Sequence, residues 1–398
     1  MEPHVPSKRG TTFFKTCFNG VNALAGLGIL SIPYALSQGG WLSLILLFAT
    51  AVICCYTGLL LQRCMDSNVL VKTYPDIGGL AFGRKGRLIV ATFMYLELYL
   101  VAIEFLILEG DNLEKLFPYT KFHIGTMKIG GKQGFVLLAA LIILPTTWLR
   151  SLTMLAYVSL GGVLACLIVV ASVLWSGVDD GVGFHERGVL LKWSGVPTAV
   201  SLFAFCFSGH AVFPTIYTAM RDRTMFSRVL FLCFGLCFLN YGLMAILGYL
   251  MYGQSLKSQV TLNLPVGKLS SKIAIYTTLI NPFTKYALVV MPIANAVEDW
   301  FQVSKNRLIS ILIRTILVVS TVVLALTVPF FGYVMALTGS FLSSTATMLL
   351  PCACYLKVFK NSLRWGFELV IILAVMLSGL AIAIMGTYSS LEQIILNL

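Results

Sequence analysis

Charged side chains are scarce in this sequence. Lys, Arg, Asp and Glu make up 11% of its 398 residues, whereas soluble domains carry about 25%. Hydrophobic residues make up 58%. This balance excludes a soluble domain and predicts an all-α integral membrane protein in a lipid bilayer. The net charge of +12 is divided among short loops, so it does not indicate a nucleic-acid partner.

Cysteine is absent from the long loops expected on the outer side, residues 111–132, 177–195 and 253–271. All ten cysteines lie in apolar segments or at their inner ends, so exported disulfides are not expected. The pairs Cys233/Cys237 and Cys352/Cys354 lack nearby His or acidic partners. We interpret them as helix-packing residues rather than metal ligands. A signal-peptide cleavage pattern is also missing, so the N-terminal segment is not interpreted as a secretory signal.

Long apolar runs are what the sequence has in place of charge. With about 20 residues needed to cross a bilayer, eleven spans are predicted, at residues 12–37, 41–63, 88–110, 133–149, 152–176, 196–220, 226–252, 272–298, 307–329, 331–356 and 366–389. The connections between them are too short to hold a soluble domain. Residues 1–398 are therefore predicted to form a single transmembrane domain.

Two of these spans contain helix-breaking residues. In GLGILSIPYALSQGG, residues 26–40, Gly28 precedes Pro33 by five positions. In FCFSGHAVFPTIYTAM, residues 205–220, Gly209 precedes Pro214 by five positions. Inside a helix glycine costs about 1 kcal/mol and proline about 3. Because backbone groups freed in lipid must find other partners, such breaks are tolerated where they line a cavity.

The two breaks divide the chain into halves. Each break begins a set of five spans, one at about 11–176 and the other at about 196–356, and an extra helix follows at 366–389. Because five is odd, the second set enters the membrane from the opposite side, which predicts a 5+5 inverted repeat. Paired interrupted helices in inverted halves indicate the binding site of a transporter. Small-residue helix packing is the alternative, but it explains neither the prolines nor the repetition.

The broken ends supply the predicted chemistry. Half-helix N-termini present N–H groups and partial positive charge to an anion such as a carboxylate. We expect residues 26–29 and 208–211 to be non-helical and to face each other across one cavity. The candidate substrate-binding residues are Asn22, Gly26, Leu27, Gly28, Ile29, Ser208, Gly209 and His210. An enzyme is not expected, because neither break has the pattern of an intramembrane protease, and no cofactor or metal site is indicated.

Several motifs together resemble the plant vacuolar amino acid transporter branch of the amino acid/auxin permease family. They are NGVNALAGLGILSIPYALSQGGW (19–41), TYPDIGGLAFG (73–83), LEGDNL (108–113), SGHAVFP (208–214), TLNLP (261–265) and NPFTKYAL (281–288). The resemblance implies an eleven-helix fold of the amino acid–polyamine–cation superfamily that moves amino acids in exchange or company with protons, in the vacuolar membrane. Members often carry a long acidic N-terminal segment, whereas the first span here is predicted from residue 12.

Charged residues inside spans are candidates for function. Glu97 is expected about 14 Å deep, and Lys285 follows Asn281-Pro282 near mid-depth. The two are candidates for proton coupling, with Lys285 standing beside the first break where sodium-driven relatives of this fold place a cation. The alternative is a structural role, as a salt bridge between them or as part of a solvated cavity wall. His210 either titrates in an acidic compartment or caps loose backbone. We interpret as structural the remaining charged residues Glu104, Arg314 and Glu368.

The leading hypothesis is thus a secondary active transporter that moves amino acids by alternating access, coupled to protons. A carrier of another small carboxylate, such as an auxin-like acid, remains an alternative. A further alternative is an amino acid sensor that binds the same ligand without transporting it. The sequence does not indicate an oligomeric state.

The distribution of basic residues predicts the orientation of the chain in the membrane. The loop ends expected on one side of the membrane carry 17 Lys and Arg residues, against nine on the other. Because basic residues accumulate on the cytosolic side, we expect a cytosolic N-terminus and a lumenal C-terminus. In sealed vesicles of known orientation, protease should cut a tag at one end and spare a tag at the other. Two cut tags, or two protected ones, would contradict the odd number of spans.

Overall fold

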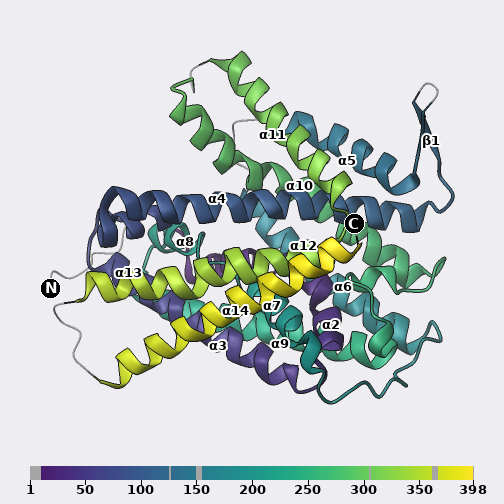
Figure 1. Ribbon diagram of the computed structural model, residues 1–398, viewed down its shortest axis with the longest axis horizontal. Coiled ribbons are helices and arrows are strands. Elements are labelled where there is room, and N and C mark those ends of the chain that lie inside the picture. The colour runs from purple at the N-terminus through teal and green to yellow at the C-terminus, as the bar shows by residue number, and fades with distance from the viewer. Residues whose placement is uncertain (1–9, 125–126, 149–154, 304–305, 361–365, 398) are drawn as a thin grey trace.

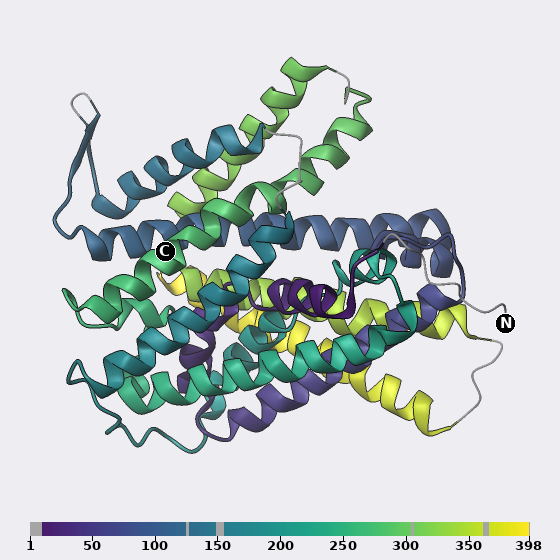
Figure 2. The same cartoon turned by 180° about the vertical axis from the view of Figure 1, so that it is seen from behind.

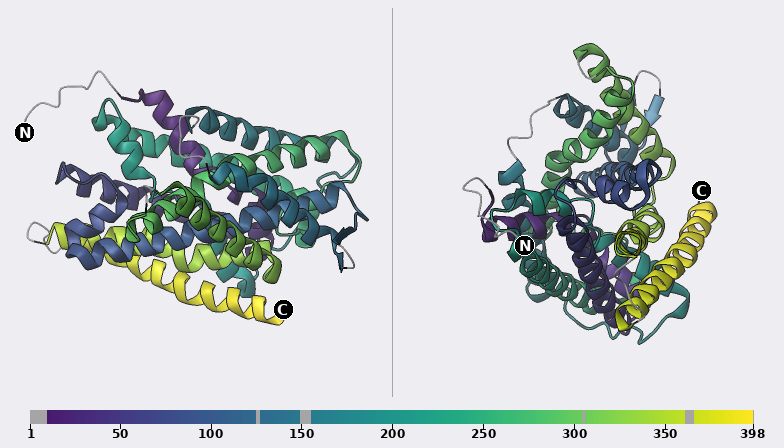
Figure 3. Two further views of the ribbon diagram at one scale, coloured as in Figure 1. Left: turned by 90° about the horizontal axis from the view of Figure 1, so that it is seen from above. Right: turned by 90° about the vertical axis from the view of Figure 1, so that its left-hand side faces the viewer.

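The computed structural model describes residues 10–124, 127–148, 155–303, 306–360 and 366–397. They form a bundle in which most helices run side by side along the long axis of the molecule (Figure 1). A view along that axis shows many of these helices end-on (Figure 3). Two short strands, β1 (Phe122–Ile124) and β2 (Met127–Ile129), pair as an antiparallel hairpin at one end of the bundle.

Helices account for nearly all of the regular structure. In chain order they are α1 (Phe13–Leu24), α2 (Gly28–Gly39), α3 (Ser43–Asp66), α4 (Tyr74–Leu116), α5 (Gly131–Thr147), α6 (Leu155–Val178), α7 (Val196–Cys206), α8 (Phe213–Ala219), α9 (Phe226–Tyr252), α10 (Leu269–Trp300), α11 (Arg307–Thr327), α12 (Phe331–Leu337), α13 (Leu350–Val358) and α14 (Phe367–Asn397). Between α12 and α13 the chain forms two π-helical stretches, Thr338–Ser343 and Thr345–Leu349.

Helix length and composition support the membrane class. Within the described ranges, eight helical segments are long and apolar enough to cross a bilayer, and the bent pair α1–α2 makes nine. Two further predicted spans, 133–149 and 196–220, contain the shorter apolar helices α5 and α7. The count of eleven therefore stays a prediction.

The helix α4 is longer than the span predicted at 88–110. It starts 14 residues earlier, at Tyr74, because Thr73 and Asp76 form a reciprocal capping box and Pro75 occupies the first turn. Gly83 interrupts it with φ 66° and ψ −153°, a conformation that glycine adopts at little cost. Tyr74 to Phe82 thus forms a short separate helix that leads into the long one.

The first break is present, but it lies slightly earlier in the chain than predicted. Ala25, Gly26 and Leu27 lie outside regular helix, and α1 and α2 are bent by 52° across them. The prediction that 26–29 are non-helical is therefore wrong for Gly28 and Ile29, which form the first turn of α2. The physical reason is that the first N–H groups of any helix lack intrahelical partners, so glycine is tolerated there. Pro33 lies inside α2.

The second break spans residues 207–212 and includes all of the predicted 208–211. It separates α7 from α8, and Pro214 occupies the first turn of α8, where its missing N–H costs no hydrogen bond. The two broken spans contact each other, because α2 of the first packs against α7 of the second. Helix α2 also packs against α9. Figure 2 shows α1 and the short α8 near each other on one side of the bundle.

Three contacts between loops and helix ends join segments that were expected on the same side. At one end of the bundle, Thr11 forms backbone hydrogen bonds with Ala219 and Arg221. Arg63 pairs with Glu368 at the same expected side, which agrees with a structural role for Glu368. At the opposite expected side, Lys132 pairs with Asp111. Five of the 17 basic residues counted above lie outside the described residues: Lys8, Arg9, Arg150, Lys305 and Arg364.

Arg314 belongs to a buried network, as expected for a structural residue. Its Nε lies 2.9 Å from Glu298 Oε1, and its two terminal nitrogens donate to the Thr147 carbonyl and to Asn295 Oδ1, each at 2.9 Å. Ser310 donates to the same Glu298 oxygen at 2.7 Å. The network ties α10 to α11 and to the end of α5.

This buried pair predicts a large loss of stability in one variant. Arg314→Met removes the cationic partner of the buried Glu298 carboxylate, at a cost of about 3–5 kcal/mol, so the unfolding midpoint of the detergent-purified protein should fall. Lys268, whose side chain is half exposed and lies 4.0 Å from Asp180, is the control, because Lys268→Met should change the midpoint little. An equal fall in both variants would contradict the structural role. The double variant Arg314→Met with Glu298→Gln should recover much of the loss.

Candidate functional site

The two breaks are held together by one tyrosine. The hydroxyl of Tyr241 on α9 lies 2.7 Å from the carbonyl oxygen of Leu24 and 3.2 Å from that of Cys206. These carbonyls belong to the last residues of α1 and α7, and Tyr241 is 1% exposed. A helix C-terminus leaves its carbonyls without intrahelical partners, so a single side chain satisfies both broken ends in turn.

Tyr241 ends a stripe on α9 that follows α1. Cys233, Cys237 and Tyr241 are four residues apart and therefore lie on one helix face. Their side chains approach the carbonyls of Cys17, Val21 and Leu24 respectively. The expected packing role of Cys233 and Cys237 is confirmed by this geometry. Sequence reasoning missed Tyr241, although its spacing from the two cysteines was visible.

Two predicted glycines pack against the opposite break. A Cβ on Gly28 would lie 2.5 Å from the sulfur of Cys206, and a Cβ on Gly209 would lie 2.9 Å from the Leu24 side chain. These glycines let the two breaks approach closely. Gly28 therefore does not border open space, whereas a Cβ on Gly26 would meet no atom within 4 Å.

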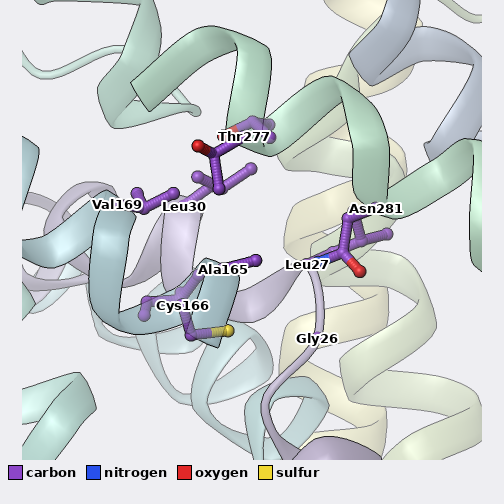
Figure 4. Close-up of a pocket in the computed structure, with 10 residues that line it drawn as sticks. Gly26, Leu27, Leu30, Ala165, Cys166, Val169, Thr277 and Asn281 are labelled. Atoms are coloured by element: carbon purple, nitrogen blue, oxygen red, sulfur yellow. The ribbon is translucent and has the colours of Figure 1, made fainter. Parts of the chain in front are cut away.

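A small cavity lies beside the first break. It is lined by Gly26, Leu27, Ile29 and Leu30 of the broken span, by Ala165, Cys166 and Val169 of α6, and by Thr277, Thr278 and Asn281 of α10. Figure 4 shows the side chains of Thr277 and Asn281 reaching from α10 toward the broken span, with Cys166 on the α6 side. The cavity measures about 20 Å³, which is room for about one water molecule. The hydroxyl oxygen of Thr278 is buried without a partner among the described residues.

The α2 N-terminus borders this cavity without a side-chain cap. The N-terminus of α8, at the second break, also lacks a side-chain cap. N–H groups at a helix N-terminus carry partial positive charge and bind anions. The predicted residues Gly26, Leu27 and Ile29 therefore line a cavity next to a site of positive potential.

The predicted residues of the second break point elsewhere. Ser208 donates a hydrogen bond of 2.7 Å to Oε1 of Glu97 on α4, and Ser343 donates to the same oxygen at 2.6 Å. His210 is 1% exposed and its Nε2 lies 2.9 Å from the Thr57 hydroxyl on α3. Glu97 is thus brought to the second break, and His210 connects that break to α3.

Lys285 and Asn22 converge at Gly162 of α6. A Cβ on Gly162 would overlap with Oδ1 of Asn22 and lie 3.4 Å from Nζ of Lys285. The alternative of a salt bridge between Glu97 and Lys285 is wrong within the described part of the chain, because Glu97 takes two serine hydroxyls as its partners. Position along a span indicates the depth of a residue and leaves the facing neighbour undetermined. Lys285 accordingly faces α6 and α1.

A family model described as transmembrane amino acid transporter protein matches residues 9–392. The chain belongs to this family. Amino acid transporter AVT1I of Arabidopsis thaliana is 51% identical over 387 residues, covering 97% of this chain and 96% of that protein. Amino acid transporter AVT1J of the same plant is 50% identical over 387 residues, covering 96% and 92%. The resemblance to the plant vacuolar amino acid transporter branch is therefore confirmed.

A solved structure shares the fold of this transporter. MhsT in complex with L-phenylalanine superposes with a TM-score of 0.61, covering 96% of this chain and 100% of that one at 13% sequence identity. At this identity the likeness concerns the fold alone. It agrees with the predicted helical fold.

The glycine contacts predict opposite outcomes for two neighbouring substitutions. In this transporter Gly28→Ala forces the added methyl group against Cys206, and such overpacking costs about 1–3 kcal/mol. Gly26→Ala meets no atom and should leave the unfolding midpoint unchanged. Thermal unfolding of the purified variants measures both. Adding Cys206→Ala should restore part of the Gly28→Ala loss, and a Gly26→Ala variant as unstable as Gly28→Ala would contradict this packing.

Proposed function

We propose that this chain is a secondary active transporter that moves amino acids across an endomembrane by alternating access and couples their movement to protons. The observation that carries the proposal is the uncapped N-terminus of α2 beside a cavity within a broken span. Family membership and the amino acid transporters named among its relatives support the substrate class.

In this proposal the first break binds the common part of an amino acid. The N–H groups of Gly28 and Ile29 receive the carboxylate, and the unpartnered hydroxyl oxygen of Thr278 accepts from the ammonium group. Because a cavity of about 20 Å³ cannot hold an amino acid, α6 or α10 must move away from α2 for substrate to enter. That movement is the opening step that alternating access requires.

Glu97 is the proposed proton-coupling residue. Its two partners are serine hydroxyls, which donate to a carboxylate and can also accept from a carboxylic acid. Glu97 can therefore gain and lose a proton while the same neighbours remain in place. A fixed ion pair would instead favour the charged form permanently. Because Ser208 belongs to the second break, the protonation state of Glu97 acts directly on that break.

Lys285 is proposed to supply a permanent positive charge beside the first break. Its ammonium group lies at Gly162 near Asn22, which projects from α1. The eleven-helix, 5+5 arrangement with a cytosolic N-terminus belongs to the same proposal. It is supported by the contacts that join ends expected on the same side. The vacuolar membrane is proposed from the relatives alone.

Uptake into proteoliposomes tests the function. Labelled amino acid should accumulate when a pH gradient is imposed, and it should exchange with unlabelled amino acid when pH is equal on both sides. Uptake of an auxin-like acid in preference to amino acids would favour the carrier of another carboxylate. Binding without any uptake or exchange would favour a sensor.

The coupling role predicts a separation of two activities. Glu97→Gln keeps a side chain that hydrogen-bonds to both serines but cannot take up a proton, so exchange should continue while gradient-driven uptake falls about a hundredfold. The control Glu392→Gln alters an exposed glutamate on α14 and should leave both activities intact. Because Glu97 and Lys285 are not paired, adding Lys285→Met should not rescue the loss. Gradient-driven uptake at the wild-type rate in Glu97→Gln would refute the coupling role.

A further inference from the structure

Three carboxyl groups lie at seven-residue intervals on α4. They are Glu97, Glu104 and Asp111. Seven residues are nearly two helical turns, so the direction of successive members drifts by only about 20°, while the helix rises about 10.5 Å per interval. Glu97 and Glu104 are 8% and 0% exposed, and the Asp111 side chain is 13% exposed. The row runs from the second break toward the end of α4.

Side chains from other segments form hydrogen bonds or an ion pair with the three carboxyl groups of this row. Thr338 donates to Glu104 Oε1 at 2.8 Å and Ser343 donates to Glu97 Oε1 at 2.6 Å, and both residues belong to the same π-helical stretch. Such stretches are frequently found at functional sites. Asp111 accepts from Gln259 at 2.8 Å and pairs with Lys132 at 2.5 Å.

One carboxyl oxygen of Glu104 lacks a hydrogen-bond partner. This oxygen, Oε2, is buried and accepts no hydrogen bond in the described part of the chain. A purely structural buried carboxyl group normally has its oxygens satisfied, since a bare carboxylate oxygen in the interior is costly. The open oxygen lies in the middle of the row, where a proton can be held and then released.

Asp111, the outer member of the row, pairs with a residue that lines a larger cavity. Lys132, which pairs with Asp111, also lines a cavity of about 310 Å³ together with Glu114, Gln133 and Pro329. Water occupies about 30 Å³ per molecule in the liquid, so this cavity holds several. Lys132 has a second partner there, the Pro329 carbonyl oxygen at 2.9 Å. It can keep that bond when Asp111 becomes neutral.

We propose that Asp111, Glu104 and Glu97 form a proton route along α4, with Glu104 as the intermediate carrier between the cavity at Lys132 and the second break. This rests on the proton coupling proposed above. Carboxylic Glu104 passes its proton through water to the Glu97 carboxylate and becomes a carboxylate itself. Asp111 then returns a proton to Glu104 and takes a replacement from water in the cavity. Each transfer breaks one O–H bond and forms another, so charge and atoms balance.

The other titratable groups on elements that pack against α4 have partners or face other helices. Arg314 of α11 pairs with Glu298 of α10, and Tyr286 of α10 shares a hydrogen bond with Thr321. Lys285 lies at Gly162. Near the other end of α4 lie, among others, the thiols of Cys64, Cys352 and Cys354 and the phenol of Tyr74, which is the first residue of α4. On α4 itself Glu109 is buried and both its carboxyl oxygens also lack partners in the described part of the chain, but it lies about 140° around the helix from Glu104 and therefore outside the row.

Glu109 provides a matched control for the test. Proteoliposomes of wild type, Glu104→Gln, Glu104→Asp and Glu109→Gln are compared for exchange at equal pH and for gradient-driven uptake, with an internal pH dye that reports proton movement. Glu104→Gln should lower gradient-driven uptake and proton movement at least about tenfold, while exchange continues. Glu104→Asp retains a titratable group and should recover part of the loss. Glu109→Gln should resemble wild type.

The outcomes separate this route from the proposed function. If the wild type moves no protons with its substrate, proton coupling and the route are both overturned. If the wild type is coupled and Glu104→Gln is coupled equally, the route alone is overturned. An equal loss in Glu104→Gln and Glu109→Gln overturns it as well, because burial rather than position would then explain the effect. Should Glu104→Gln fail to fold, wild-type coupling in Asp111→Asn would overturn the route.

Discussion

The structure depends on how the two broken helices satisfy their backbone groups where water is excluded. The helices that precede the breaks, α1 and α7, end at Leu24 and Cys206, whose carbonyls share the hydroxyl of Tyr241. The helices that follow the breaks, α2 and α8, begin without a side-chain cap. The carbonyl groups are thus satisfied by the protein, while N–H groups with partial positive charge have no side-chain partner. This asymmetry underlies the proposed binding of an anionic group at the first break.

The helix α4 connects this site to the rest of the bundle. It packs against α5, α10, α11 and α13, and its carboxyl group at Glu97 receives hydrogen bonds from the second break and from the π-helical stretch at Thr338–Ser343. A change of charge at that one position therefore acts on two segments that are distant in sequence. This arrangement gives a physical basis for linking protonation to movement of the broken span, since both hydroxyl partners respond to the same oxygen.

Much of the fold could be predicted because lipid imposes simple rules. Apolar length identified the long spans, and Gly/Pro pairs identified both breaks. Burial of all ten cysteines in the structure agrees with their placement in apolar segments. The same rules did not predict which neighbouring residue a side chain contacts. Gly28 faces Cys206 rather than open space, Glu97 faces serines rather than Lys285, and Tyr241 was not identified. The early start of α4 depended on a capping box that hydropathy does not register.

By itself, the sequence determined the membrane class, the two interrupted spans and the family resemblance that the relatives confirm. These properties follow from local composition and from residues close together in the chain, such as Gly209 and Pro214. Only the tertiary structure decided which groups meet: that Tyr241 serves two helix ends, that Lys285 lies beside Asn22, and that Thr338 and Ser343 face carboxyl groups on α4. The physical reason is that depth in a bilayer is set by distance along a helix, whereas contacts are set by the rotation and crossing of helices, which depend on packing between distant segments.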